Sequence, residues 1–534
     1  MDSRKANHVR NMRKALGGLT FLLVVGGCDS FWSHLSDDCE LLVTCDHFYP
    51  SGTGGSVPNP SCEADPTQNA STVTDECAVF ASATAEAGGD GTKAKPYGSL
   101  GEAVAKANGK RVLACTSGAF EESVRIEAGV EVIGGFNCAA EWTWSEEARS
   151  AIEGPAGAVA LTMTEGASGA KVRSFAIRAA SATEPGGSSI GVAVADVEAK
   201  LAQVDVTAGD GMDGANGETP TEAPQAGASA PMNVSNACTN PNVVFGGDPG
   251  VTECEDGETR GGAGGPGGIT GTEEGNGEKG ADGAPLPEPN PSNRGIGGSG
   301  QTDPADECNA GANGKSGDPG DHGIAGSDTT LTLAGIVGGD GQRGTSGKRG
   351  QGGGGGGGAK AGVFCPGAGG TTVDGVGASG GGGGAGGCGG KGGGGGKAGG
   401  SSLGIVSLGT KLVLTEVTVA VGKAGKGGNG AGGRGGAAGG SGATGGTASP
   451  LGGSIGCDGG RGGQGGMGGP GAGGRGGHAV GLAYAVAPGA AVTLANFMGG
   501  TAGEGGGTAP RGNTGDVGVS GECWDFTGNA SCGQ

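Results

Sequence analysis

The sequence predicts an all-β protein in which short strands alternate with long glycine-rich excursions. Apolar and polar residues alternate in segments such as 171–178 and 411–419, which is the pattern of half-buried strands. Glycine supplies 136 of 534 residues and aromatic residues only 3%, so one large conventional core is not expected. Within residues 427–445 every third residue is glycine. This is the period of polyproline II, whose crowded face accepts only glycine when such helices pack together.

The first 28 residues have the pattern of an export signal. A basic stretch precedes the apolar segment 19–25, which is far shorter than the roughly 20 residues of a membrane-spanning helix. Residues 25–28, Val-Gly-Gly-Cys, resemble the bacterial lipobox, with valine where leucine is usual. The resemblance implies lipidation of Cys28 and anchoring to a membrane of the bacterial cell envelope, inner or outer. An ordinary signal peptide cleaved elsewhere is the alternative.

Cysteine usage agrees with export to an oxidising compartment. Of 15 cysteines, 14 remain when Cys28 is set aside, an even number compatible with disulfides. No C-x-x-C motif occurs and the five histidines are scattered, so neither a metal site nor a cofactor is expected. Pairing of sequential neighbours is one hypothesis among many connectivities, and it gives Cys39–Cys45, Cys62–Cys77, Cys115–Cys138, Cys238–Cys254, Cys365–Cys388 and Cys523–Cys532, with Cys308 and Cys457 left to bridge.

The formal net charge of −21 argues against a nucleic-acid partner. Binding of nucleic acid needs stripes of lysine and arginine with interleaved aromatic residues. The acidic balance favours solubility in a crowded envelope, or weak binding of cations.

Residues 80–208 carry a resemblance to a known fold. A glycine/aspartate turn at 88–92, a Pro-Tyr pair, and a short helix at 101–107 precede a ladder of strands. These features look like the entry of right-handed parallel β-helices of the pectate-lyase-like superfamily. Residues 118–135 are similar to the first coils of such domains. The resemblance implies a solenoid in which each coil buries its face only by stacking on the next.

Later segments repeat the strand–turn–strand pattern, so the β-helix is expected to continue to about Met498. The repeats lie at 190–207, 403–419 and 480–497, with 329–337 as a partial one. Long glycine-rich excursions then leave from one repeated turn and fall on one side of the solenoid. We expect them to form antiparallel legs that hydrogen-bond to each other. Flexible linkers and a collagen helix remain alternatives. In composition alone, the excursions resemble the glycine-rich regions of mycobacterial PE-PGRS proteins.

The expected organisation has ten parts. They are a signal peptide (1–28), a cysteine-bearing tether (29–80), a cap with the first coils (81–208), an insertion rich in Gly, Pro and Asp (209–328), a β-helix strand (329–337), a glycine-rich insertion (338–400), a coil (401–422), a second glycine-rich insertion (423–477), a further coil (478–498) and a C-terminal tail (499–534).

No catalytic residue can be identified from the sequence. Lyase chemistry of the kind the resemblance suggests needs carboxylates that hold calcium, with an Arg or Lys as base. Asp196 with Asp205, or Glu121 and Glu122 with Arg125, are candidates, but no motif separates them from solvated surface charge.

Two tryptophans are the candidates for binding. Trp142 and Trp144 would point the same way on an extended strand and would offer a platform for sugar rings. Alternatively, they cover the edge of an early coil.

These observations favour a lipid-anchored envelope protein with a structural, adhesive or glycan-contacting role. The alternative is a polysaccharide lyase or hydrolase of the parallel β-helix superfamily. Binding of ice or a flat surface is a third hypothesis, against which Arg434, Arg461, Gln464 and Met467 count.

Overall fold

The computed structural model describes residues 62–239, 244–272, 274–489, 492–507 and 512–532, which belong to one compact unit. Strand accounts for 26% and helix for 4%, and the large sheets are built from parallel pairs. The fold-class prediction is therefore confirmed at the level of a mostly-β protein with parallel sheets.

The first sheet is ten-stranded within the described residues. Its main path runs β1 (Ala78–Ala81), β2 (Arg111–Cys115), β5 (Glu131–Asn137), β9 (Ala170–Ala179), β11 (Ala199–Ala208), β19 (Leu412–Val421) and β21 (Asn496–Met498), and all of these neighbours are parallel. Off this path lie β3 (Ala119–Phe120), β6 (Thr143–Trp144) and β7 (Ser150–Gly154).

The second sheet is seven-stranded over the same residues. Its order is β4 (Val124–Ile126), β8 (Val159–Met163), β10 (Ser189–Val194), β18 (Ser402–Ser407), β20 (Ala479–Tyr484), β22 (Ser520–Asp525) and β23 (Ala530–Ser531). Only the pair β22–β23 is antiparallel.

Successive strands alternate between the two sheets, so that β8, β10, β18 and β20 belong to the second and β9, β11, β19 and β21 to the first. One buried cluster combines Val172, Phe175 and Leu201 of the first sheet with Val192 and Ile405 of the second. The alternating patterns noted in the sequence thus place one apolar row of each strand in this shared core.

Three non-glycine residues at matching positions have left-handed backbones. Ser174, Gln203 and Glu416 have φ angles of 60°, 54° and 53°, and the registers of β9, β11 and β19 place them side by side. The Ser174 hydroxyl lies 3.3 Å from Oε1 of Gln203. Such angles are rare outside glycine, so a bend is repeated at the same place in each strand.

The α-helix α2 (Leu100–Ala105) packs near the start of the sheets. Ser99 caps it by accepting a hydrogen bond from the amide of Glu102, as an N-cap serine does. Glu122 accepts from the amide of Leu100 at 2.6 Å, which is favourable at a helix N-terminus. Short 3₁₀ turns occupy Ala70–Thr72, Cys138–Ala140, Glu165–Ala167 and Ala368–Gly370.

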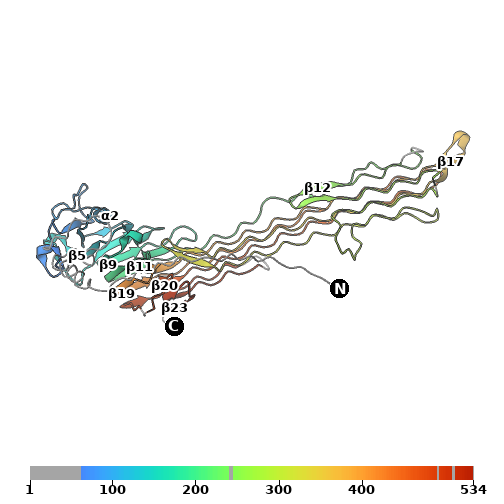
Figure 1. Cartoon of the computed structure of the whole chain (residues 1–534). Helices are drawn as coiled ribbons and strands as arrows, with labels where there is room; N and C mark the ends of the chain where they lie inside the picture. Colours follow the sequence, from blue (N-terminus) through green and yellow to red (C-terminus); the bar gives the residue numbers. More distant parts are fainter. Residues whose placement is uncertain (1–61, 240–243, 273, 490–491, 508–511, 533–534) are drawn as a thin grey trace, which may run out of the picture. The chain divides into compact units, whose positions relative to one another are not determined.

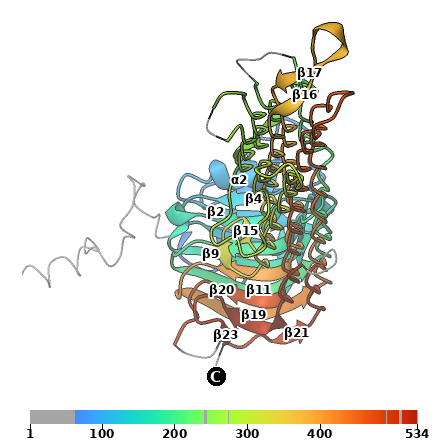
Figure 2. The same ribbon diagram turned by 90° about the vertical axis from the view of Figure 1, so that its right-hand side faces the viewer.

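The glycine-rich segments lie side by side and run away from the two sheets (Figure 1), as the view turned by 90° also shows (Figure 2). We call the described residues of 209–328, 339–361, 376–401, 422–478 and 499–518 the glycine bundle. Segments 341–359 and 378–396 run antiparallel, with amides three apart donating in turn: Gly341 to Gly396, Gly344 to Gly393 and Gly347 to Gly390. The prediction of ordered legs that hydrogen-bond to each other is confirmed for these residues.

A stretch of the glycine bundle has more consecutive glycines where more neighbouring segments surround it. In the all-glycine stretch 352–358, the amides of Gly352, Gly353 and Gly354 donate to three different segments, at Ala284, Gly384 and Ala312. Every face of this stretch is buried, and a Cβ at Gly353 would lie 2.1 Å from the carbonyl oxygen of Gly460. Segment 311–326 hydrogen-bonds mainly to two neighbouring segments, 342–354 and 458–473, and it has glycine only at every third position.

Three antiparallel hairpins interrupt the bundle. They are β12 (Val251–Cys254) with β13 (Gly257–Arg260), β14 (Thr329–Thr332) with β15 (Gly335–Gly338), and β16 (Gly362–Pro366) with β17 (Thr372–Gly375). The prediction of a β-helix strand at 329–337 is therefore wrong. Gly335, at φ 104°, lets the chain turn back on itself. Leu331, Leu333 and Ile336 of this hairpin pack onto the core of the second sheet. The predicted tail at 499–534 also contributes β22 and β23 to that sheet.

Buried serines hold the points where the bundle leaves the first sheet. Ser189, at the start of β10, accepts a hydrogen bond from the amide of Gly209, just after β11, at 2.8 Å. Ser402, at the start of β18, accepts from the amide of Gly422, just after β19, at 2.8 Å. The two exits are thus built in the same way.

Six disulfides join described cysteines. Cys62–Cys77, Cys115–Cys138 and Cys523–Cys532 form as predicted, and Cys308 bridges to Cys457. The predicted pairs Cys238–Cys254 and Cys365–Cys388 are wrong, because Cys238 bonds to Cys365 and Cys254 to Cys388. Neighbours in the bundle are far apart in sequence, so sequence proximity was the wrong guide. Cys28, Cys39 and Cys45 lie outside the described residues.

Candidate functional site

The glycine bundle has a break where residues 218–226, here called the arch, leave its regular packing. The amide of Gly217 donates to the carbonyl of Asn429, and that of Gly227 donates to the carbonyl of Ala438. Between these two contacts the chain advances ten residues on the side of the arch (227 − 217) and nine on the opposite segment (438 − 429). Within the arch no residue is glycine, and Pro220 and Pro224 have no amide hydrogen to donate. The arch therefore has to bulge.

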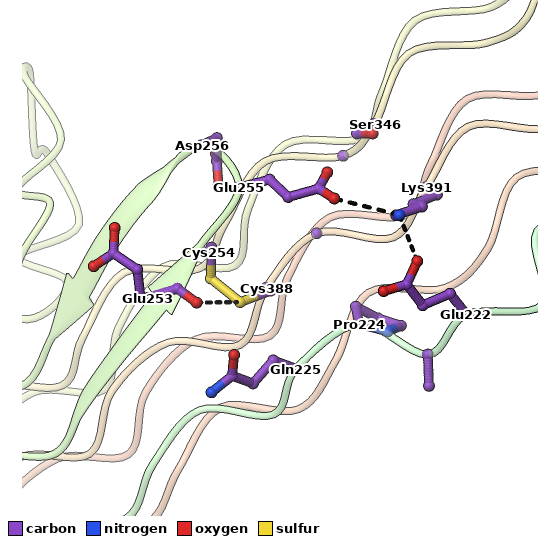
Figure 3. Close-up of a pocket in the computed structure, with 13 residues that line it drawn as sticks. Glu222, Pro224, Gln225, Glu253, Cys254, Glu255, Asp256, Ser346, Cys388 and Lys391 are labelled. Atoms are coloured by element: carbon purple, nitrogen blue, oxygen red, sulfur yellow. Dashed lines mark hydrogen bonds and ion pairs between the residues drawn. A yellow bond between two sulfur atoms is a disulfide. The ribbon is translucent and has the colours of Figure 1, made fainter.

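A hollow lies between the arch and the hairpin β12–β13, with a cavity volume of about 210 Å³ (Figure 3). The disulfide Cys254–Cys388 forms part of its wall and ties the hairpin to segment 378–396. The covalent bond fixes the position of the β12–β13 turn, which carries Glu255 and Asp256. The disulfide and the hairpin backbone thus hold one wall of the hollow in place.

Lys391 is the central charge of this hollow. Its Nζ lies 2.5 Å from Oε2 of Glu222 in the arch and 3.3 Å from Oε1 of Glu255 (Figure 3). The hydrogen bond from Lys391 holds the pKa of Glu222 below its usual value. Glu222, and after it Glu255, raises the pKa of Lys391. The carboxylates are 72% and 75% exposed, so these pairs orient the arch but contribute little to stability.

Further charges complete the rim. A guanidinium nitrogen of Arg349 lies 3.4 Å from the Asp256 carboxylate, and Glu253 lines the same hollow. Among the described residues, no three His, Cys, Asp or Glu side chains are grouped so that they would hold a metal ion. The arrangement suits recognition of charged and hydrogen-bonding groups.

The arch also borders an open groove with a cavity volume of about 560 Å³. The groove is lined by Thr219, Ala223 and Pro224 of the arch and by residues 433–437 of the opposite segment. Nη1 of Arg434 donates to the carbonyl of Pro220 across it at 3.4 Å. Three of its eight lining residues are glycines, at positions 433, 435 and 436.

Glu222, Lys391, Arg349 and Arg434 were not identified as site residues from the sequence. The signal that points to them is the loss of the three-residue glycine phase between Gly217 and Gly227, where two prolines occur. A break in an otherwise regular repeat marks a place where the backbone stops pairing.

The two tryptophans do not form the platform for sugar rings. Trp142 is 4% exposed, and its ring meets Phe80 edge-on with centroids 4.7 Å apart. Its φ is 58°, so residues 142–144 are not one extended strand and the side chains do not share a face. Trp144 pairs with Phe136 across β5 and β6. Both rings cover the early part of the first sheet, which is the alternative that the sequence left open.

The carboxylates considered for catalysis make local contacts. Glu122 binds the N-terminus of α2, and Arg125 pairs with Glu127 at 2.5 Å. Asp205 accepts a hydrogen bond from Thr418 at 2.6 Å and lies 3.6 Å from Arg149. These contacts do not bring the candidates together.

Cys28 lies outside the described residues. No helix in the part of the chain that the structure describes has the length and apolar character needed to span a bilayer. No protein-family model matches the chain, and no curated protein or solved structure is significantly similar to it.

Proposed function

We propose that this chain is a lipid-anchored protein of the bacterial cell envelope that holds the glycine bundle outside the membrane as a structural or adhesive element. The observation that carries the proposal is the cross-linking of the bundle by Cys238–Cys365, Cys254–Cys388 and Cys308–Cys457. Such bonds persist in exported proteins and are rare in reducing compartments. Together with the signal-like N-terminus, they support export.

The bundle suits a load-bearing or adhesive role because its backbone amides are used to bind neighbouring segments. Segment 378–396 alone pairs with 341–359, 428–446 and 457–472 through amides spaced three residues apart. A structure of this kind presents the remaining side chains, such as Arg461 and Met467, to the surroundings. We propose polysaccharide or other envelope components as the partner.

We also propose that the two parallel sheets form a right-handed parallel β-helix. The alternation of strands between sheets and the matching bends at Ser174, Gln203 and Glu416 support this arrangement. In such a solenoid the glycine-rich segments are insertions that leave after a first-sheet strand.

Anchoring is tested by growing cells that express the full chain with a radiolabelled or alkyne-modified fatty acid. The wild type should acquire label and fractionate with membranes, whereas Cys28→Ser should be unlabelled and released. Label that persists in Cys28→Ser contradicts the anchor.

The adhesive role is tested by retention of the purified, disulfide-intact chain on insoluble envelope polysaccharide. Gly383→Ala, which places a Cβ 2.1 Å from a backbone oxygen in the bundle, should reduce retention. Gly435→Ala, which meets nothing within 4 Å, should not. Equal retention of both variants argues against a role for the bundle.

A further inference from the structure

The segment before the arch shows how the glycine bundle accepts a neighbour. The amides of Gly211, Gly214 and Gly217 donate to the carbonyls of Lys423, Lys426 and Asn429 at 2.7–2.8 Å. In return, the amides of those three residues donate to the side chains of Asp210, Asp213 and Asn216 at 2.7–2.8 Å. Each of these three contacts therefore runs in both directions, and each uses an Asp or Asn directly before a glycine.

This series of two-way contacts is interrupted at the arch. The next positions in the three-residue phase are Gly432 and Gly435. Within the described residues, neither has a hydrogen bond from its backbone amide or to its carbonyl. Beyond them the row resumes in one direction at Ala438, whose carbonyl accepts from Gly227 at 2.9 Å. It resumes in both directions at Ser441, which accepts from Ala230 at 2.9 Å and donates to the hydroxyl of Ser229 at 3.1 Å. Two contacts are thus missing from a continuous row.

Of these two positions, Gly435 lines the open groove beside the arch. Residues 433–437 line it, and a Cβ built at Gly435 would have nothing within 4 Å. The groove is a continuation of the lane that residues 209–217 occupy in the bundle. It also has a positive group, because Arg434 reaches across to the neutral carbonyl of Pro220 at 3.4 Å. A carboxylate would be a stronger partner for that guanidinium.

We infer that this groove binds an extended peptide with glycine at every third position and Asp or Asn before each glycine. The bound peptide would take the place that the arch leaves empty, donating to the carbonyl of Gly435 and accepting from its amide. A peptide that adds a strand to the edge of a sheet binds in a comparable way, because main-chain hydrogen bonds supply its affinity and side chains supply its specificity. The inference does not depend on the lipid anchor or on glycan contact.

The chain supplies the template for the probe. Residues 210–217, Asp-Gly-Met-Asp-Gly-Ala-Asn-Gly, occupy the lane next to the groove. A Cβ at Gly214 in that lane would lie 2.2 Å from the carbonyl oxygen of Lys397, so a version with its three glycines replaced by alanine is a control of equal length and charge.

The test is fluorescence anisotropy of the labelled eight-residue peptide titrated with the disulfide-intact full chain. We expect saturable binding to the wild type and at least tenfold weaker binding of the alanine peptide. Gly435→Leu should also weaken binding at least tenfold, because its side chain fills the groove without meeting neighbours. Gly489→Leu, at another glycine with nothing within 4 Å and outside the groove lining, should bind like the wild type.

Arg434→Gln separates recognition of charge from recognition of shape. This variant should bind the peptide several-fold more weakly than the wild type does. Changing both aspartates of the peptide to asparagine should not weaken its binding to Arg434→Gln any further. Thermal melting of each variant shows whether the fold is intact. No saturation up to about 1 mM protein overturns the inference. Equal binding of the alanine peptide, or equal losses in Gly435→Leu and Gly489→Leu, overturns it as well.

Discussion

The hydroxyl of Ser402 accepts a hydrogen bond from the amide of Gly422 at 2.8 Å, which joins the start of β18 to the chain leaving β19. Ser189 and Gly209 repeat this contact one unit earlier. The contact marks where sheet ends and glycine bundle begins.

Ser402→Ala should lower the free energy of unfolding by about 1–3 kcal/mol. The reason is that the amide of Gly422 loses its acceptor, the hydroxyl of the fully buried Ser402. Urea denaturation followed by circular dichroism measures the change. Thr410→Ala, an exposed residue of the turn before β19, is the matched control and should differ from the wild type by less than about 0.5 kcal/mol.

Gly383→Ala should destabilise the glycine bundle by about 2 kcal/mol or more, since the added methyl would lie 2.1 Å from the carbonyl oxygen of Gly353 and backbone must move. Gly435→Ala adds the same methyl in open space and should be neutral. Differential scanning calorimetry of the two variants distinguishes a close-packed bundle from a flexible linker, in which both would behave alike.

Removal of the Cys254–Cys388 disulfide should lower the free energy of unfolding more than removal of the Cys523–Cys532 disulfide. The first closes a separation of 134 residues and the second one of 9, which corresponds to about 5 and about 2.5 kcal/mol in the chain-entropy model. Paired serine variants unfolded under non-reducing conditions give the comparison. Peptide mapping of the unreduced chain should find Cys238 joined to Cys365; a Cys365–Cys388 peptide would contradict the structure.

Acid should destabilise the fold through His478. Burial, and after it the charge of Arg475, lowers the pKa of His478 to about 3, while its ring accepts a hydrogen bond from Val519 at 3.2 Å. The unfolded state, with a pKa near 6.5, binds the proton more readily, so this contribution is present above about pH 6.5 and is lost as the pH falls toward 3.

Between about pH 6.5 and pH 3, the free energy of unfolding should fall by up to about 1.4 kcal/mol for each pH unit. His478→Gln keeps an acceptor but does not titrate, so its unfolding free energy should change less between pH 7 and pH 4 than that of the wild type. Parallel curves for the two proteins would show that His478 is not the group responsible.

Local patterns predicted the strands well. Segment 171–178 falls within β9, and 411–419 overlaps β19, because alternation of apolar and polar residues reports burial directly. The hairpin β14–β15 was missed because its residues alternate like a strand of the sheets, and only the left-handed Gly335 reverses the chain.

The candidate site was harder to predict, because it depends on which segments become neighbours. The three-residue glycine phase indicates packing but not partners, so the pairing of Cys254 with Cys388 has no local signal. The sequence left two placements open for Trp142 for a related reason, since its left-handed backbone, which places the ring in a cluster with Phe80, has no local signal. The arch, in contrast, does have a signal in its two prolines.

The glycine bundle repeats the same hydrogen bonds every three residues. These bonds alone therefore do not distinguish one alignment of two neighbouring segments from an alignment shifted by three residues. If residues 209–217 slid by three positions, Asp213 would face Lys423 as Asp210 does now, and the amide of Gly214 would face the Lys423 carbonyl as that of Gly211 does now. The same slide would carry a cysteine roughly 9 Å along a polyproline II axis. That is beyond the 5.4 Å between the Cα atoms of Cys254 and Cys388, so oxidation seals only the correctly aligned bundle. The disulfides thus favour one alignment among those that a three-residue repeat allows.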